Sequence, residues 1–151
     1  KHLFFLPVNH DGPEGLDAVV QRTGVPVFIE WACDPSSLVS QEYLSRGGQA
    51  IRLGLPETDL SDRETVKEVK TMIHDILAMG QQVTIWASLP CHSWCSWHRV
   101  TVAEHPWKLP DVLADQTASR RMIQLLVEVW QELKDTNLLS LSFEWPAACM
   151  G

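Results

Sequence analysis

The chain has 151 residues, of which 45% are hydrophobic and 21% charged, a balance typical of one globular domain rather than of a disordered chain. Its apolar runs are far shorter than the roughly 20 residues of a membrane-spanning helix, so we expect no membrane segment. The net charge of −7 disfavours DNA or another nucleic acid as a partner, because nucleic-acid-binding proteins usually present a basic face.

The cysteines and the N-terminus suggest where the chain comes from. Its four cysteines are spread unevenly and give no framework for a secreted, disulfide-rich domain. We therefore expect reduced thiols and an intracellular chain, in the cytoplasm or the nucleus. The opening apolar stretch is too short for a signal peptide, and a first residue of Lys rather than Met indicates that the chain was cut from a longer one.

From residue 25 onward, apolar strand-like runs alternate with amphipathic segments. We predict, in order, a leading helix at 13–23, a strand at 25–31, a helix at 36–48, a strand at 49–55, a helix at 61–80, a strand at 81–89, a helix at 111–137 and a strand at 138–145. Ser36 or Ser37 would cap the helix at 36–48. Ser61 and Glu64 would form a capping box for the helix at 61–80, which Gly80 would end.

Strands that alternate with helices predict an α/β fold with right-handed crossovers and a mostly parallel sheet covered on both faces. Ligand sites in such sheets form outside the carboxyl ends of the strands. Three unusual clusters lie at predicted strand ends, namely EWACDPSS (30–37), SLPCHSWCSWH (88–98) and FEWP (143–146). We therefore expect the chemistry where these clusters meet.

The second cluster supports two interpretations of Cys91. A cysteine that follows a proline on a loop after a strand can be a nucleophile if its thiolate is stabilised. It can equally be a loop cysteine packed beside Trp94 and Trp97. Zinc could use Cys91, His92, Cys95 and His98, but no second compact ligand pair follows, so we assign no metal and keep a zinc-stabilised domain as an alternative.

The other two clusters are also open to two interpretations. Glu144 beside Trp145, if shielded from water, would have a raised pKa and could donate a proton; otherwise it is a solvated glutamate at a strand end. Glu30, followed by a turn of small residues and a helix start, has the layout of a nucleotide-binding turn. The usual glycines of that turn are absent, and Ala32, Cys33, Ser36 and Ser37 stand in their places.

In their order, these clusters resemble the cofactor-binding half of class I S-adenosylmethionine-dependent methyltransferases, especially the DNA cytosine-5 methyltransferases. The chain is still more similar to the methyltransferase-like segment of retrotransposon polyproteins from marine protists such as dinoflagellates. The resemblance covers residues 27–146. The matching residues are Glu30, Cys33, Ser37, Gly48, Arg52, Asp59-Leu60, Ile85-Trp86, Ser88, Pro90-Cys91, Trp97 and Glu144-Trp145-Pro146.

This resemblance implies a three-layer Rossmann-like methyltransferase domain over residues 25–151, preceded by a leading segment, 1–24, to which we assign no role. It implies that Cys91 attacks carbon 6 of a flipped cytosine in DNA and that Glu144 protonates or hydrogen-bonds the ring nitrogen. Trp94 or Trp97 would neighbour the flipped base. The expected contacts of the cofactor, S-adenosylmethionine, are Glu30, Ala32, Cys33, Ser37, Asp59 and Pro90.

The chain also departs from the methyltransferase pattern. It has no glycine between Glu30 and Ser37, Trp145 stands where the cytosine-5 enzymes have Asn, and one strand–helix unit is missing between residues 56 and 81. The domain is also expected to be truncated, because the chain stops before the remaining strands. These departures leave a second hypothesis open, a catalytically inactive scaffold module that contacts other domains of a retroelement polyprotein.

Overall fold

A five-stranded sheet forms the centre of the molecule in the computed structural model, which describes residues 6–7, 24–34 and 36–145. The strand order is β1-β3-β2-β4-β5. The strands are β1 (Leu6–Pro7), β2 (Val27–Trp31), β3 (Gln49–Leu53), β4 (Val83–Ser88) and β5 (Leu139–Glu144). Strand β1 pairs antiparallel with β3 at one edge, and the other four strands are parallel. The predicted mostly parallel sheet is therefore confirmed.

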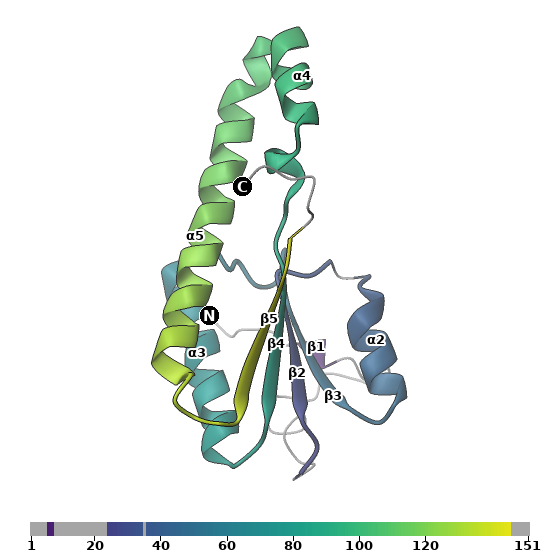
Figure 1. Cartoon of the computed structure of the whole chain (residues 1–151), viewed down its shortest axis with the longest axis vertical. Helices are drawn as coiled ribbons and strands as arrows, with labels where there is room; N and C mark the ends of the chain where they lie inside the picture. The colour runs from purple at the N-terminus through teal and green to yellow at the C-terminus, as the bar shows by residue number, and fades with distance from the viewer. Residues whose placement is uncertain (1–5, 8–23, 35, 146–151) are drawn as a thin grey trace.

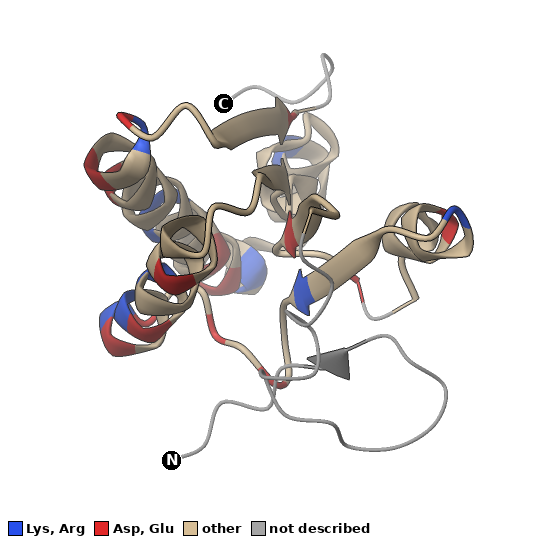
Figure 2. Cartoon of the chain, turned by 90° about the horizontal axis from the view of Figure 1, so that it is seen from below, with Lys and Arg blue, Asp and Glu red and all other residues tan. Residues whose placement is uncertain are grey.

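Helices lie on both faces of this sheet (Figure 1 and, from below, Figure 2). They are α2 (Leu38–Ser45), α3 (Arg63–Ala78), α4 (Trp97–Glu104) and α5 (Leu109–Leu133), with the 3₁₀ turns η1 (His92–Trp94) and η2 (Pro106–Lys108). Helix α2 lies on one face and α3 and α5 lie together on the other, while α4 and the first turns of α5 extend beyond the sheet. The described residues form an α/β architecture that is compatible with a Rossmann-like fold.

The hydrophobic core lies between the sheet and the pair α3 and α5. In the strand register, Ile29 is opposite Ile51 on one side and Ile85 on the other, so aliphatic side chains form a row across the sheet. All three are almost fully buried, and at roughly 25 cal/mol per Å² such side chains stabilise the fold by about 1.5–3 kcal/mol each. Helix α3 adds the apolar stripe that its spacing predicted, comprising Val66, Val69, Met72, Ile73, Ile76 and Leu77.

The helix caps agree with the prediction in one case and correct it in the other. Ser37 caps α2, since its hydroxyl accepts a hydrogen bond from the Val39 amide at 3.3 Å. The cap of α3 is Asp62 rather than Ser61, because the Asp62 carboxylate accepts from both the amide and the hydroxyl of Thr65 at 2.9 Å. Ser61 instead donates to Asp59, in the turn before the helix. The predicted capping box was therefore wrong.

Other parts of the prediction differ from the structure or fall outside it. Helix α4 was not predicted, and it has no buried residue, so it carries no apolar stripe that the sequence could reveal. The predicted helix at 13–23 and nearly all of the leading segment 1–24 lie outside the described residues. No helix in the described ranges is both long and apolar enough to cross a membrane.

The order in which strands are added to the sheet changes direction between the parallel neighbours β2 and β4. From β2 the chain passes through α2 to β3 on one side, and from β4 it passes through α5 to β5 on the other. The loops that leave the carboxyl ends of β2 and β4 therefore diverge. In open parallel sheets, this switch point is where ligands bind.

Candidate functional site

A cavity of about 540 Å³ lies at this switch point, within the range of about 300–1,000 Å³ typical of small-molecule sites. Its walls come from the ends of β2, β3 and β4, from α2 and from α5. The lining residues are Glu30, Ala32, Cys33, Asp34, Ser37, Val39, Gly54, Leu55, Thr58, Leu60, Ser88, Pro90 and Met122. Five of the six predicted cofactor contacts are among them, and Asp59 is not.

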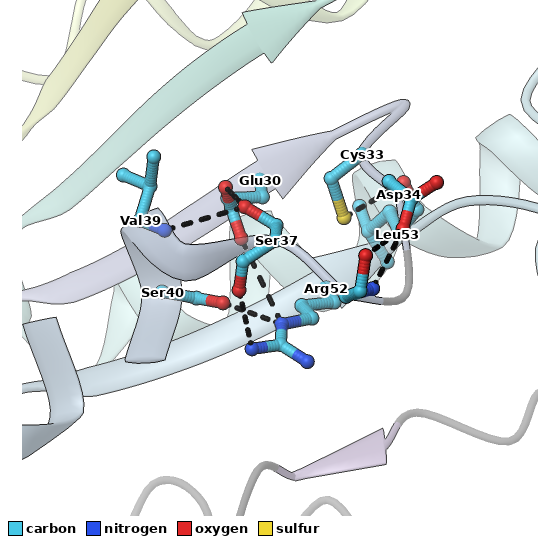
Figure 3. A network of polar contacts seen from close by, with 9 residues as sticks. Glu30, Cys33, Asp34, Ser37, Val39, Ser40, Arg52 and Leu53 are labelled. Carbon is cyan, nitrogen blue, oxygen red and sulfur yellow. Dashed lines mark hydrogen bonds and ion pairs between the residues drawn. The ribbon is translucent and has the colours of Figure 1, made fainter. Parts of the chain in front are cut away.

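Glu30 is the most buried charged residue of this cavity, with 2% of its surface exposed. Ser37 donates a hydrogen bond of 2.6 Å to its Oε1 atom, and the Arg52 Nε atom lies 3.7 Å from its Oε2 atom (Figure 3). Oε2 accepts no hydrogen bond from the described residues. The guanidinium offsets the cost of burying the carboxylate, while one carboxylate oxygen keeps unused capacity to accept a hydrogen bond.

Arg52 connects three elements around this carboxylate. It lies on β3, pairs with Glu30 of β2, and donates to the Ser37 carbonyl at 3.0 Å and to the Ser40 hydroxyl, both near the start of α2. Figure 3 shows the Arg52 guanidinium beneath Glu30 and Ser37. The sequence resemblance assigned Arg52 no role beyond its place in the motif. In the structure, Arg52 holds the turn between β2 and α2 in place.

The turn after β2 is held against the end of β3. The amides of Ala32 and Cys33 both donate to the Leu53 carbonyl, at 2.7 and 3.3 Å, and Ala32 has a positive φ of 63°. A Cβ atom on Gly54 would lie 2.4 Å from the Cys33 carbonyl oxygen, so this close approach requires glycine. The turn itself has no glycine, and the glycine that permits the close approach follows β3, the neighbouring strand.

Cys33 is a neutral thiol. Burial, and then the nearby Glu30 carboxylate, raises its pKa from 9.0 to about 11. Its Sγ atom donates to the Leu53 carbonyl at 3.9 Å. A thiol with so high a pKa is a poor nucleophile at neutral pH, so Cys33 can contribute contact surface but not covalent chemistry.

Asp59, the sixth predicted cofactor contact, does not line the cavity. Its carboxylate accepts hydrogen bonds from the Ser61 amide at 2.9 Å and the Ser61 hydroxyl at 2.7 Å. Its side chain is exposed, whereas the two flanking residues, Thr58 and Leu60, are buried and line the cavity. The structure thus assigns Asp59 to the turn that precedes α3.

The loop that carries Cys91 is fastened to α5 by several side chains. Trp94 donates from Nε1 to the Ser119 hydroxyl at 3.2 Å, and Gln116 donates to the Ser93 carbonyl at 2.8 Å. His92 Nε2 lies 3.3 Å from an Asp115 carboxylate oxygen. Cys91 itself is half-buried and precedes η1. The loop is therefore held in a defined position beside Pro90, which lines the cavity.

The two tryptophans proposed as neighbours of a base have different surroundings. The Arg120 guanidinium lies 4.8 Å from the centroid of the Trp94 ring, and the Trp145 ring packs edge-on against it at 6.2 Å. Trp94 is thus already packed on two sides. Trp97 is 76% exposed, so its ring is open to a partner.

Glu144 ends β5 directly opposite Ser88 of β4. Trp86 donates to the Ser88 hydroxyl at 3.0 Å, and Ser88 donates to Glu144 Oε2 at 3.2 Å. Glu144 is exposed, so it is the solvated strand-end glutamate rather than a carboxyl shielded by Trp145. The resemblance gave Ser88 no role beyond its place in the motif. In the structure, Ser88 lines the cavity and its hydroxyl is bonded to Glu144.

Neither Cys91 nor Glu144 is among the residues that line the cavity. Cys91 follows β4, which borders the cavity, and Glu144 ends β5, the next strand along the sheet. Within the part of the chain that the structure describes, no group of three His, Cys, Asp or Glu side chains could hold a metal ion. Cys149 lies outside that part.

Comparisons of the chain with protein-family models, with curated proteins and with solved structures gave no match.

Proposed function

We propose that this chain is an S-adenosylmethionine-dependent methyltransferase module whose cofactor occupies the cavity at the carboxyl ends of β2, β3 and β4. One observation carries the proposal. The cavity lies at the switch point of a parallel sheet, and five of the six residues nominated from the sequence line it.

The residues present fit such a cofactor. The cavity of about 540 Å³ is large enough for a nucleoside with an amino-acid tail. Oε2 of Glu30 can accept a hydrogen bond from a ribose hydroxyl, since it accepts none within the described chain. Val39, Leu55, Leu60 and Met122 supply apolar walls for a purine. When bound, S-adenosylmethionine supplies an electrophilic methyl group.

The proposed methyl acceptor is cytosine, with Cys91 as the nucleophile and Glu144 as its acid partner. Addition of the Cys91 thiolate to carbon 6 would push electron density to carbon 5, and Glu144 would hydrogen-bond or protonate the ring nitrogen. The placement of both residues at neighbouring strand ends supports this pairing. The hydrogen bonds from α5 to the loop after Pro90 would hold Cys91 in position during attack.

An inactive scaffold is the second candidate, and two observations favour it. The Glu30 carboxylate is already engaged by Ser37 and Arg52, and Glu144 is exposed to water. A scaffold needs an intact fold but no cofactor. Binding of S-adenosylmethionine therefore discriminates between the two candidates.

The test is calorimetric titration of S-adenosylmethionine into the purified chain and into two matched variants. Val39 lines the cavity and is 46% exposed, so Val39→Trp should fill the cavity without removing core contacts. Val100 is 48% exposed on α4 and does not line this cavity, so Val100→Trp is the control. We expect binding that Val39→Trp abolishes and Val100→Trp retains.

If millimolar S-adenosylmethionine produces no heat of binding, the cofactor proposal is refuted and the inactive scaffold remains as the candidate function. Binding that Val39→Trp does not weaken would place the cofactor elsewhere and refute the site. If binding holds, an oligonucleotide containing 5-fluorocytosine should form a covalent adduct with the parent chain, but not with a Cys91→Ser variant. Mass spectrometry would detect this adduct, and an intact Cys91 would exclude the cytosine mechanism.

A further inference from the structure

A second cavity of about 500 Å³ lies between η1, α4 and α5. It shares no lining residue with the first cavity. It lies where α4 and the first turns of α5 extend beyond the sheet in Figure 1. Because α4 has no buried residue, close packing between these helices does not fill the space.

Two residues that line this cavity each have a buried polar atom without a hydrogen-bond partner in the described chain. Ser93 is only 2% exposed, and its hydroxyl forms no hydrogen bond with the described chain. The Nδ1 atom of His98 is likewise buried without a hydrogen bond. Folded proteins leave few buried polar groups unsatisfied, because each costs about 1–3 kcal/mol. Their presence at one cavity points to a ligand that supplies the missing partners.

Arg99 adds a positive charge to the same cavity. It follows His98 on α4 and lines the cavity, and it forms no ion pair with any carboxylate of the described residues. Asp111 and Asp115 adjoin α5 residues of the wall in sequence; Asp115 lies 3.3 Å from His92, and neither carboxylate pairs with Arg99 within the described residues. A guanidinium in this setting favours an anion.

The remaining wall is largely apolar, with Val102, Leu109, Val112 and Leu113 facing the space. We propose that this cavity binds a small monocarboxylate with a flat apolar body. The body would contact the aliphatic walls, and the carboxylate would accept hydrogen bonds from Arg99 and Ser93. This inference does not depend on the proposed methyltransferase function, because the two cavities have separate linings.

The test uses two probes of equal shape, 2-naphthoate and its neutral amide, 2-naphthamide. Binding is followed by changes in the amide NMR signals of the ¹⁵N-labelled chain, which also show which cavity responds. We expect naphthoate to shift the signals of residues 93–103 and 109–116, with naphthamide about five- to tenfold weaker because it lacks the charge-assisted hydrogen bonds.

Three variants refine the test. Arg99→Gln should lower the affinity for naphthoate about five- to tenfold and leave the affinity for naphthamide unchanged. Ser93→Ala should weaken naphthoate without lowering the thermal midpoint, because it removes a hydroxyl that has no partner in the described chain. Ala103 lines the cavity, so Ala103→Phe should fill part of it and abolish naphthoate binding. Ala114→Phe is its control, since Ala114 is also exposed but lies on α5 outside the lining.

Equal affinity for the two naphthalene probes, or no effect of Arg99→Gln, would overturn the assignment of a carboxylate. Signal changes confined to the first cavity would overturn the site itself. Because S-adenosylmethionine is titrated separately and reports through Val39→Trp, failure here and failure of the proposed function give different results.

Discussion

Replacing Arg52 by methionine should destabilise the chain far more than removing an exposed arginine. The substitution keeps a long apolar side chain but leaves the Glu30 carboxylate buried, at 2% exposure, without its counter-charge. At an effective dielectric constant of about 20, the 3.7 Å separation of Arg52 Nε and Glu30 Oε2 corresponds to ~4.5 kcal/mol of attraction. Breaking a buried pair in this way typically costs about 3–5 kcal/mol.

The assay is urea denaturation followed by circular dichroism. With a slope of about 2 kcal/mol per M, Arg52→Met should lower the midpoint by roughly 1.5–2.5 M. The control is Arg46→Met, because Arg46 pairs with Glu42 on exposed surface and such pairs contribute about 0–1 kcal/mol.

A second variant tests the cause of the loss. The double substitution Glu30→Gln with Arg52→Met removes the buried charge together with its partner, so it should recover a large part of the lost stability. If the double variant is no more stable than Arg52→Met alone, the loss comes from the bonds of Arg52 to Ser37 and Ser40 instead. A midpoint shift as small as that of Arg46→Met would refute the reasoning altogether.

Further predictions concern the turns and the cysteine around the site. Asp62→Ala should lower the free energy of unfolding by about 1 kcal/mol and Ser61→Ala by less, as thermal denaturation would show, because Asp62 caps α3; the reverse order would restore Ser61 as the cap. Gly54→Ala should cost about 1–3 kcal/mol in the same assay, since the added Cβ meets the Cys33 carbonyl, and wild-type stability would show that the turn yields easily. Folding raises the pKa of Cys33 from 9.0 to about 11, so the folded state holds this proton more tightly. The stability linked to this proton is present below pH 9 and lost between pH 9 and 11. The denaturation midpoint of Cys33→Ala should therefore fall less steeply between pH 9 and 11 than that of the parent chain.

The fold could be predicted from the sequence because its strands and the helices α3 and α5 have clear patterns of apolar residues. The stripe of Val66, Val69, Ile73 and Ile76 has one face to bury, and it packs against the sheet as expected. Helix α4 lacks such a stripe, and its existence depends on how the chain leaves the Cys91 loop and returns to α5. No local pattern encodes that path.

Only part of the site could be predicted from the sequence, because some of its residues interact across the sheet rather than along the chain. Residues that follow a strand directly, such as Ala32 and Pro90, could be placed from the rule that strand ends gather at one edge of the sheet. Gly54 and Arg52 contact residues of a neighbouring turn that lie 21 and 15 residues away in the chain, so no local spacing reveals them. The exposure of Glu144 likewise depends on what covers it in three dimensions.

Helix α5 is a wall of both cavities. Met122 lines the first, Val112 and Gln116 line the second, and Ser119 between them donates to the Pro90 carbonyl at 3.5 Å. Ten residues of rigid helix, about 15 Å, thus join the two spaces. A ligand whose binding displaces α5 must change the affinity of the other cavity, and thermodynamic linkage makes that coupling reciprocal: each occupant would alter the other's dissociation constant by the same factor.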